Sequence, residues 1–385
     1  MSAQFENLKV SGTVRARFNR AASGLLAMVA VMAFASPALA KDPFKTMMRP
    51  GFNRPGNVLI ADQFNNRVIE VDRQGNIVWQ FGKGPTDFTA ASIVGVNDAQ
   101  RVGPFTLMAG TGTPPATVPT CTDPAGCPDN RVMLVGPSGH ILWQYGTFGV
   151  SGSGPDQLNT PTQATYLPNG HILISDQANQ RVIEVNFAKA IVWQYGTTGV
   201  SGNGADQLNS PNSAELLENG HVLIADEGNN RAIEVDRALN VVATFSAGGT
   251  VNGMAFASRL PNGNTLLTDA GNSRIVEVDP NDASVWEYFT NTESGSNPAP
   301  SPTRAIRLRN GNTIISDQNN QRVIVVDAGK NIVASFGNLN ASGYGTSNAS
   351  QGLYGPYDAK VIGDYTGLTP PFDFDRGAGD PSGRH

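Results

Sequence analysis

The sequence predicts an all-β protein, a six-bladed β-propeller of four-stranded antiparallel blades. Three observations support this prediction. A strand-rich motif recurs along most of the chain at a period of roughly 45–55 residues, the range of propeller blades. Short β-branched runs alternate with tight-turn signals, and no helical periodicity separates the copies. Gly and Pro are abundant, with 43 and 25 residues, as expected for many short strands joined by turns.

Five copies of the motif are clear. Each has a glycine-containing turn, an apolar strand, a D-x-x-N-x-R turn, a β-branched strand and a last strand with large aromatics. They span residues 56–82, 169–196, 219–245, 262–289 and 310–337. A sixth copy around 128–146 is degraded, because Gly110 replaces the repeated Asp of its first apolar strand.

One more short strand precedes the turn of a typical copy, as in PTQATYL, PNSAELL and PTRAIRL. Blade one lacks a convincing strand of this kind upstream. The segment YGPYDAKVIG, from Tyr354 to Gly363, has the same pattern, and no further strands follow it. We therefore expect this C-terminal strand to join blade one and close the ring. Stacking the sheets around an axis then buries both faces of every blade.

The ends of the chain are predicted to lie outside this ring. Residues 1–40 resemble a signal peptide, with a basic leader, an apolar run too short to span a bilayer and small residues up to Ala40, where cleavage is expected. The propeller then covers residues 41–368, with an insertion in blade two at about 111–130, and residues 369–385 form a tail. We expect a periplasmic or secreted protein without membrane insertion.

Charge excludes one class of partner. The leader carries four basic residues and one acidic residue, so the net charge of −5 becomes −8 once it is removed. An acidic body without a basic stripe binds nucleic acid poorly, because most of that affinity comes from neutralising phosphates. We therefore expect no nucleic-acid partner.

The two cysteines, Cys121 and Cys127, lie in the blade-two insertion. In an oxidising compartment the expected state is a local disulfide that pins this loop. Further metal ligands are not evident nearby, and the two-residue spacing of redox-active pairs is missing.

An Asp and an Arg recur five residues apart in five blades. The pairs are Asp62 and Arg67, Asp176 and Arg181, Asp226 and Arg231, Asp269 and Arg274, and Asp317 and Arg322. A catalytic group is needed once, so we interpret these pairs as structural, with the Asp capping turn N–H groups. No cofactor or metal is expected. A divalent cation such as calcium remains the alternative, although these turns lack alternating carboxylates.

Candidate ligand-binding residues are those that break the repeat near the channel. Aligned innermost strands place Gln163, Ser213, Arg304 and Asp358 in one row together with Phe256, and Asn252 lies near the same rim. Arg304 and Asp358 either form a salt bridge that fills the channel or make the polar end of a ligand site. In the second case, Asp358→Ala should alter ligand retention while folding is preserved.

The repeat resembles the NHL repeat in a bacterial extracytoplasmic version. The resemblance rests on L-x-x-P, NG, L-I-x-D-x-x-N-x-R-x-x-E-V-D and Y/F-G, and it covers the chain from Gly56 to about Gly363. The last strand, EVDRQGNIVWQFG, also faintly resembles the tryptophan-bearing repeats of quinone-dependent dehydrogenases and arylsulfotransferases. Those repeats usually lack the D-x-x-N-x-R turn, so we rank them second.

Two functions remain open. The favoured one is a binding or scaffolding module for a protein, peptide or glycan partner, because no catalytic constellation is visible. The alternative follows from resemblance, since six-bladed relatives include lactonases, lyases and esterases with a metal at the channel mouth. Here Asp358, Gln163 and Asn252 would hold the cation, which is few oxygens for a hard ion. The oligomeric state is left open.

Overall fold

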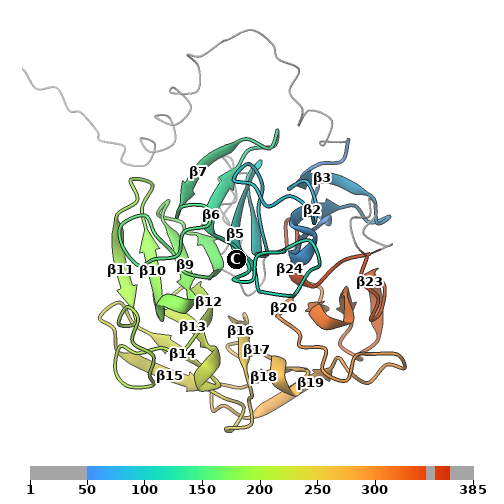
Figure 1. Cartoon of the computed structure of the whole chain (residues 1–385). Coiled ribbons are helices and arrows are strands. Elements are labelled where there is room, and N and C mark those ends of the chain that lie inside the picture. Colours follow the sequence, from blue (N-terminus) through green and yellow to red (C-terminus); the bar gives the residue numbers. More distant parts are fainter. Residues whose placement is uncertain (1–49, 344–351, 365–385) are drawn as a thin grey trace, which may run out of the picture. The chain divides into compact units, whose positions relative to one another are not determined.

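The computed structural model describes residues 50–343 and 352–364. They form six four-stranded antiparallel sheets, each ordered from the axis outward, which are the six predicted blades (Figure 1). The innermost strands of blades one to six are β24 (Pro356–Val361), β4 (Val96–Val102), β8 (Pro161–Tyr166), β12 (Pro211–Leu216), β16 (Met254–Arg259) and β20 (Arg304–Arg307).

Three further strands complete each blade. The second strands are β1 (Val58–Asp62), β5 (Phe105–Thr113), β9 (Ile172–Asp176), β13 (Val222–Asp226), β17 (Thr265–Asp269) and β21 (Thr313–Asp317). The third strands are β2 (Arg67–Val71), β6 (Cys127–Val135), β10 (Arg181–Val185), β14 (Arg231–Val235), β18 (Arg274–Val278) and β22 (Arg322–Val326). The outermost strands are β3 (Ile77–Phe81), β7 (Ile141–Tyr145), β11 (Ile191–Tyr195), β15 (Val241–Phe245), β19 (Ser284–Phe289) and β23 (Ile332–Gly337).

Ring closure by the C-terminal strand is confirmed. β24 pairs antiparallel with β1, with Ile60 opposite Ala359 and Leu59 opposite Lys360. β24 also contacts the innermost strands of both neighbouring blades, β20 and β4. Blade one is therefore assembled from the two ends of the described chain.

Each D-x-x-N-x-R turn forms one short 3-10 helix. The five helices are η1 (Gln63–Asn65), η2 (Gln177–Asn179), η3 (Glu227–Asn229), η4 (Ala270–Asn272) and η5 (Gln318–Asn320). In blade three the turn closes with Gln180 in the left-handed region (φ 58°), which sets Asp176 opposite Arg181. Gly196 follows β11 with φ 96°, and a Cβ there would lie 2.3 Å from the Gln180 carbonyl oxygen. This close approach explains the Gly that ends the Y/F-G motif.

The apolar core is divided among the blade interfaces. One cluster of buried side chains lies between each pair of neighbouring blades; between blades six and one, for example, Ile60 and Ile69 pack with Ile306 and Val323. The apolar core is therefore spread around the ring rather than gathered in one centre.

An alanine occupies the same position in all six innermost strands. The six are Ala99, Ala164, Ala214, Ala257, Ala305 and Ala359, and all are buried. The blades converge at this radius, so a methyl group is small enough for neighbouring innermost strands to approach one another. We did not anticipate this row from the repeat motif.

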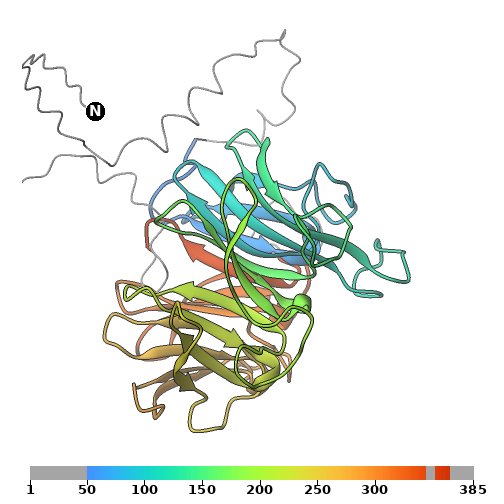
Figure 2. The ribbon, with the colours of Figure 1, turned by 90° about the vertical axis from the view of Figure 1, so that its left-hand side faces the viewer.

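Blade two departs from the others at its β5–β6 hairpin. Both strands have nine residues, and part of the predicted insertion is therefore strand. Figure 2 shows this teal hairpin projecting beyond the loops of the neighbouring blades. The predicted disulfide between Cys121 and Cys127 is present and closes the loop between the two strands.

Candidate ligand site at the upper mouth of the channel

The end of the channel where the innermost strands begin is called the upper mouth. It carries the five 3-10 helices, because the first residue of an innermost strand pairs with the repeated Asp in blades one, three, four and five, as Pro161 does with Asp176. The blade-two hairpin loop joins β5 to β6 at the same end. Loops from all six blades thus meet there.

Five blades have one repeated Asp each, and its side chain accepts hydrogen bonds from groups of the turn. Asp176 accepts hydrogen bonds from the Asn159 N–H at 2.8 Å, Asn179 Nδ2 at 2.8 Å and Arg181 Nε at 2.8 Å. Burial raises the pKa of Asp176, and it raises that of Asp317 to about 6. Within residues 50–343 and 352–364, no three His, Cys, Asp or Glu side chains are grouped closely enough to hold a metal ion.

In blade two, a carboxylate on the third strand takes the place of the repeated Asp, which in the other blades ends the second strand. Asp129, on β6, accepts the Val94 N–H at 2.7 Å and Arg131 Nε at 2.6 Å. A Cβ at Gly110 would lie 2.5 Å from Asp129 Oδ2. The glycine that made this copy look degraded therefore provides the space for a carboxylate that arrives from the opposite strand.

The axial row comprises Asp98, Gln163, Ser213, Phe256, Arg304 and Asp358, one from each innermost strand, and all six are buried. In four of them a side-chain oxygen accepts a backbone N–H from the next blade. Asp358 accepts the Ala99 N–H at 3.1 Å, and Asp98 accepts the Ala164 N–H at 3.2 Å. Gln163 accepts the Ala214 N–H at 2.7 Å, and Ser213 accepts the Ala257 N–H at 3.4 Å. Gln163 and Ser213 thus connect neighbouring blades.

Two acids and two bases form a buried cluster on the axis. Lys360 Nζ donates to Asp98 Oδ1 at 2.7 Å and to Asp358 Oδ2. Arg304 lies 3.9 Å from an oxygen of each carboxylate. Burial raises the pKa of Asp98, while the charge of Lys360 opposes this shift. Since both carboxylates already face cations, this donor set does not suit a divalent metal ion.

Two side chains reach across the channel to the opposite blade. Arg304, in blade six, donates from Nη2 to the Thr162 carbonyl of blade three at 3.2 Å. Tyr357, in blade one, has its hydroxyl 2.9 Å from Asn212 Nδ2 of blade four. The Arg304 guanidinium also lies 4.7 Å from the Phe256 ring centroid. Together they fill the axis below the upper mouth.

The Tyr357 hydroxyl joins six polar side chains at the mouth in what we call the mouth ring: Gln63, Asn97, Gln177, Asn212, Glu227, Gln318 and Tyr357. Four of these occupy the position directly after the repeated Asp, where the sequence has Gln63, Gln177, Glu227, Ala270 and Gln318. The sequence prediction missed this position. The sequence does mark this position, because its side chain varies from blade to blade while the Asp before it is repeated.

The mouth ring has two arcs. Gln318 Nε2 donates to Gln63 Oε1 at 2.7 Å, and Gln63 Nε2 donates to Asn97 Oδ1 at 2.6 Å. On the other arc, Glu227 Oε2 accepts Gln177 Nε2 at 3.0 Å and Asn212 Nδ2 at 2.8 Å.

One acid and one phenol of the mouth ring have displaced pKa values. Burial raises the pKa of Glu227. Burial and the nearby Glu227 carboxylate raise the pKa of Tyr357 to about 12. The phenol therefore stays protonated at neutral pH.

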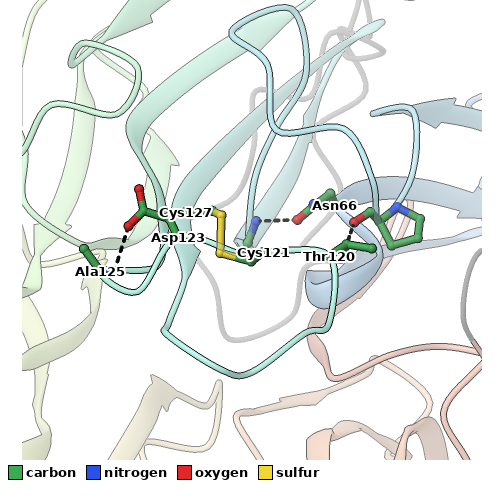
Figure 3. Close-up of a disulfide and its surroundings, with 8 residues drawn as sticks. Asn66, Thr120, Cys121, Asp123, Ala125 and Cys127 are labelled. Atoms are coloured by element: carbon green, nitrogen blue, oxygen red, sulfur yellow. Dashed lines mark hydrogen bonds between the residues drawn. A yellow bond between two sulfur atoms is a disulfide. The ribbon is translucent and has the colours of Figure 1, made fainter.

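The blade-two loop reaches over to blade one at this mouth. Its Thr117 carbonyl accepts the Tyr354 hydroxyl at 3.1 Å, and its Thr120 hydroxyl donates to the Pro85 carbonyl at 2.7 Å. Figure 3 shows the disulfide between Thr120 and Asp123. The disulfide therefore holds a loop that borders the candidate site.

Asn252 lies at the same end of its blade, next to η4. Asn252 is exposed in the loop before β16, where its backbone N–H donates to Asp269 at 2.8 Å and its carbonyl accepts the Gly271 N–H. His171 and His221 each contact a glutamate of their own blade, Glu184 at 2.6 Å and Glu234 at 2.7 Å.

The pH dependence of the Glu184 contacts can be predicted. Burial would raise the pKa of Glu184, but hydrogen bonds from Arg237, His171 and Asn169 outweigh it and hold the pKa below its ordinary value of 4.5. A carboxyl with a lowered folded pKa stabilises the fold above its unfolded pKa, and this contribution is lost as pH falls through the folded value. We expect Glu184→Gln to cost about 1–2 kcal/mol at pH 7 and progressively less below pH 4.5.

Urea unfolding at pH 7, 5, 4 and 3.5 measures this difference. The control is Glu287→Gln, whose carboxylate is 42% exposed and pairs with Arg274 at 3.3 Å. We expect the control to cost less than about 0.5 kcal/mol at every pH. A Glu184→Gln cost that stays constant or grows on acidification would contradict the linkage.

These features define the class of the protein as a six-bladed β-propeller with a filled axis and a polar upper mouth. No protein-family model matches the sequence, and no curated protein matches it. No helix in the described part of the chain is long and apolar enough to cross a bilayer.

Solved structures share the architecture. A protein of unknown function from Bacteroides caccae has a TM-score of 0.51 at 14% identity, over 73% of this chain and 93% of that one. A streptogramin B lyase has a TM-score of 0.49 at 12% identity, over 78% and 84%. The WD40 propeller domain of Doa1 has 0.45 at 12% identity, over 74% and 84%. Identities this low establish the fold alone.

Proposed function

We propose that this protein is an extracytoplasmic propeller of NHL-repeat type that acts as a binding module. Its partner, a protein, peptide or glycan, docks on the upper mouth. The observation that carries the proposal is the axis itself. Arg304 and Tyr357 each reach the opposite blade, so the mouth has a floor and presents a ring of polar groups. The disulfide in the bordering loop is in keeping with an oxidising compartment.

Charge distribution supports binding over metal-dependent catalysis. The two axial carboxylates are engaged by Lys360 and face Arg304, which leaves no open set of oxygen ligands on the axis in the described structure. A hard divalent cation requires six or more oxygens. Binding through amides and a phenol needs no such centre.

One observation favours the enzymatic alternative of the lyase, lactonase or esterase type. Glu227 is a carboxyl with a raised pKa at the mouth, and Asn212 contacts both it and the Tyr357 hydroxyl. Carboxyls with perturbed pKa values in concave sites are candidates for general acids. Glu227→Gln removes the acid while keeping a hydrogen-bonding group of the same shape.

The test blocks the mouth with a bulky cation. The purified protein is screened against a peptide display library and a printed glycan array, next to Gln177→Arg at the mouth and Gln194→Arg on outermost strand β11. We expect binding in the wild type and in Gln194→Arg, and its loss in Gln177→Arg. Binding that survives Gln177→Arg overturns the proposal. Turnover of an ester and lactone panel that Glu227→Gln abolishes favours the enzyme instead.

A further inference from the structure

We propose that the ligand of the upper mouth is a neutral carbohydrate. This inference rests on the proposed function and names the chemical class that the mouth recognises. Its basis is the kind of hydrogen-bonding group present at the mouth and the balance of charge beneath it.

The accessible groups of the mouth ring suit hydroxyls. Gln177, Gln318 and Tyr357 are each partly exposed, and each combines a donor with an acceptor in one side chain. A sugar hydroxyl has the same dual character and hydrogen-bonds to both arcs without a change of protonation. The half-buried Tyr357 ring adds an aromatic surface against which the C–H face of a sugar can pack.

The charges below the ring do not favour an ionic ligand of either sign. Asp98 and Asp358 balance Arg304 and Lys360 within the buried cluster. The cluster therefore has no spare counter-charge for an anion or a cation, and such a ligand would lose hydration without gaining an ion pair. A neutral ligand does not meet this cost.

A peptide is the less favoured occupant. Peptides anchor mainly through apolar or aromatic side chains in pockets, or by pairing along an exposed sheet edge. Of the five residues that follow the repeated Asp, only Ala270 is apolar. The innermost strand edges face one another across the crowded axis, where the Ala row packs.

The experiment uses an array of neutral, sialylated and sulfated oligosaccharides, followed by calorimetry with the best neutral binder at 0.1 and 0.5 M NaCl. We expect binding that is insensitive to salt, since no ion pair is formed. Gln177→Ala and Gln318→Ala should each weaken Kd roughly three- to tenfold, the effect of one lost hydrogen bond. Gln194→Ala, which removes the same group from β11, should leave Kd unchanged.

The outcomes separate this inference from the proposed function. Three results overturn the assignment to a neutral carbohydrate and leave a mouth site for another ligand: binding of acidic glycans alone, binding of peptides alone at the same two glutamines, or no binding of any neutral oligosaccharide. Neutral-glycan binding that neither mouth variant weakens overturns both proposals.

Discussion

A chain that ends before Gly355 is expected to lose the cooperative unfolding of the whole ring. The truncation removes β24, and with it the innermost strand of blade one and the contacts to blades six and two. The core is divided among the interfaces, so two of its six clusters lose members, among them Ala359 and Ile362. We expect a loss on the order of 5 kcal/mol or more, comparable with the whole stability of a typical domain.

Thermal unfolding followed by circular dichroism measures this effect. A chain that ends after Asp364 is the control, because it keeps every strand described here. A synthetic peptide of residues 353–364 should restore part of the transition when added in trans, since it supplies the missing strand. An unchanged melting temperature in the shorter chain would refute closure by β24 as a source of stability.

Asp358→Ala is expected to destabilise the protein by about 3–5 kcal/mol, the usual cost of leaving a buried charge uncompensated. The Asp358 side chain is 1% exposed, and its loss leaves Lys360 and Arg304 facing Asp98 alone. From sequence alone we expected Asp358→Ala to alter ligand retention while folding was preserved. Complete burial changes that expectation, because this carboxylate also accepts the Ala99 N–H of the next blade.

A double variant separates charge balance from general damage to the core. In Asp358→Ala/Lys360→Met one acid and one base are removed together, so the remaining Asp98 and Arg304 stay balanced. The free energy of unfolding is measured by urea for the wild type, the two single variants and the double variant. We expect the double variant to lose at least 1 kcal/mol less than the sum of the two single losses. Additive losses would mean that the two charges do not act as a pair.

Much of the fold could be predicted from the sequence because the repeat is a local pattern. Strand runs, turn glycines and the D-x-x-N-x-R motif each act within a few residues, and their recurrence predicts stacked blades. Closure of the ring by the segment Tyr354–Gly363 could be predicted from the same pattern. The disulfide between Cys121 and Cys127 could be predicted from their short separation and the expected oxidising compartment. The predicted signal peptide and the predicted tail from residue 369 onward fall outside the described residues.

The candidate site could be predicted only in part. Five of the six residues of the axial row were predicted, without Asp98, and Gln163 and Ser213 accept backbone N–H groups of the next blade. The mouth ring was missed because its members come from five blades, and their closeness follows from ring closure. Asp129 was missed because it lies on the third strand of its blade, whereas the repeated Asp ends the second strand.

The sequence by itself determined the number of blades, their strand order and the strand that closes the ring, since these depend on periodicity and turn chemistry. Only the tertiary structure decided what the odd residues do. Lys360 and Asp98 are 262 positions apart, yet they share a hydrogen bond on the axis. Such contacts depend on the directions in which six converging strands project their side chains, and one-dimensional spacing does not contain that information.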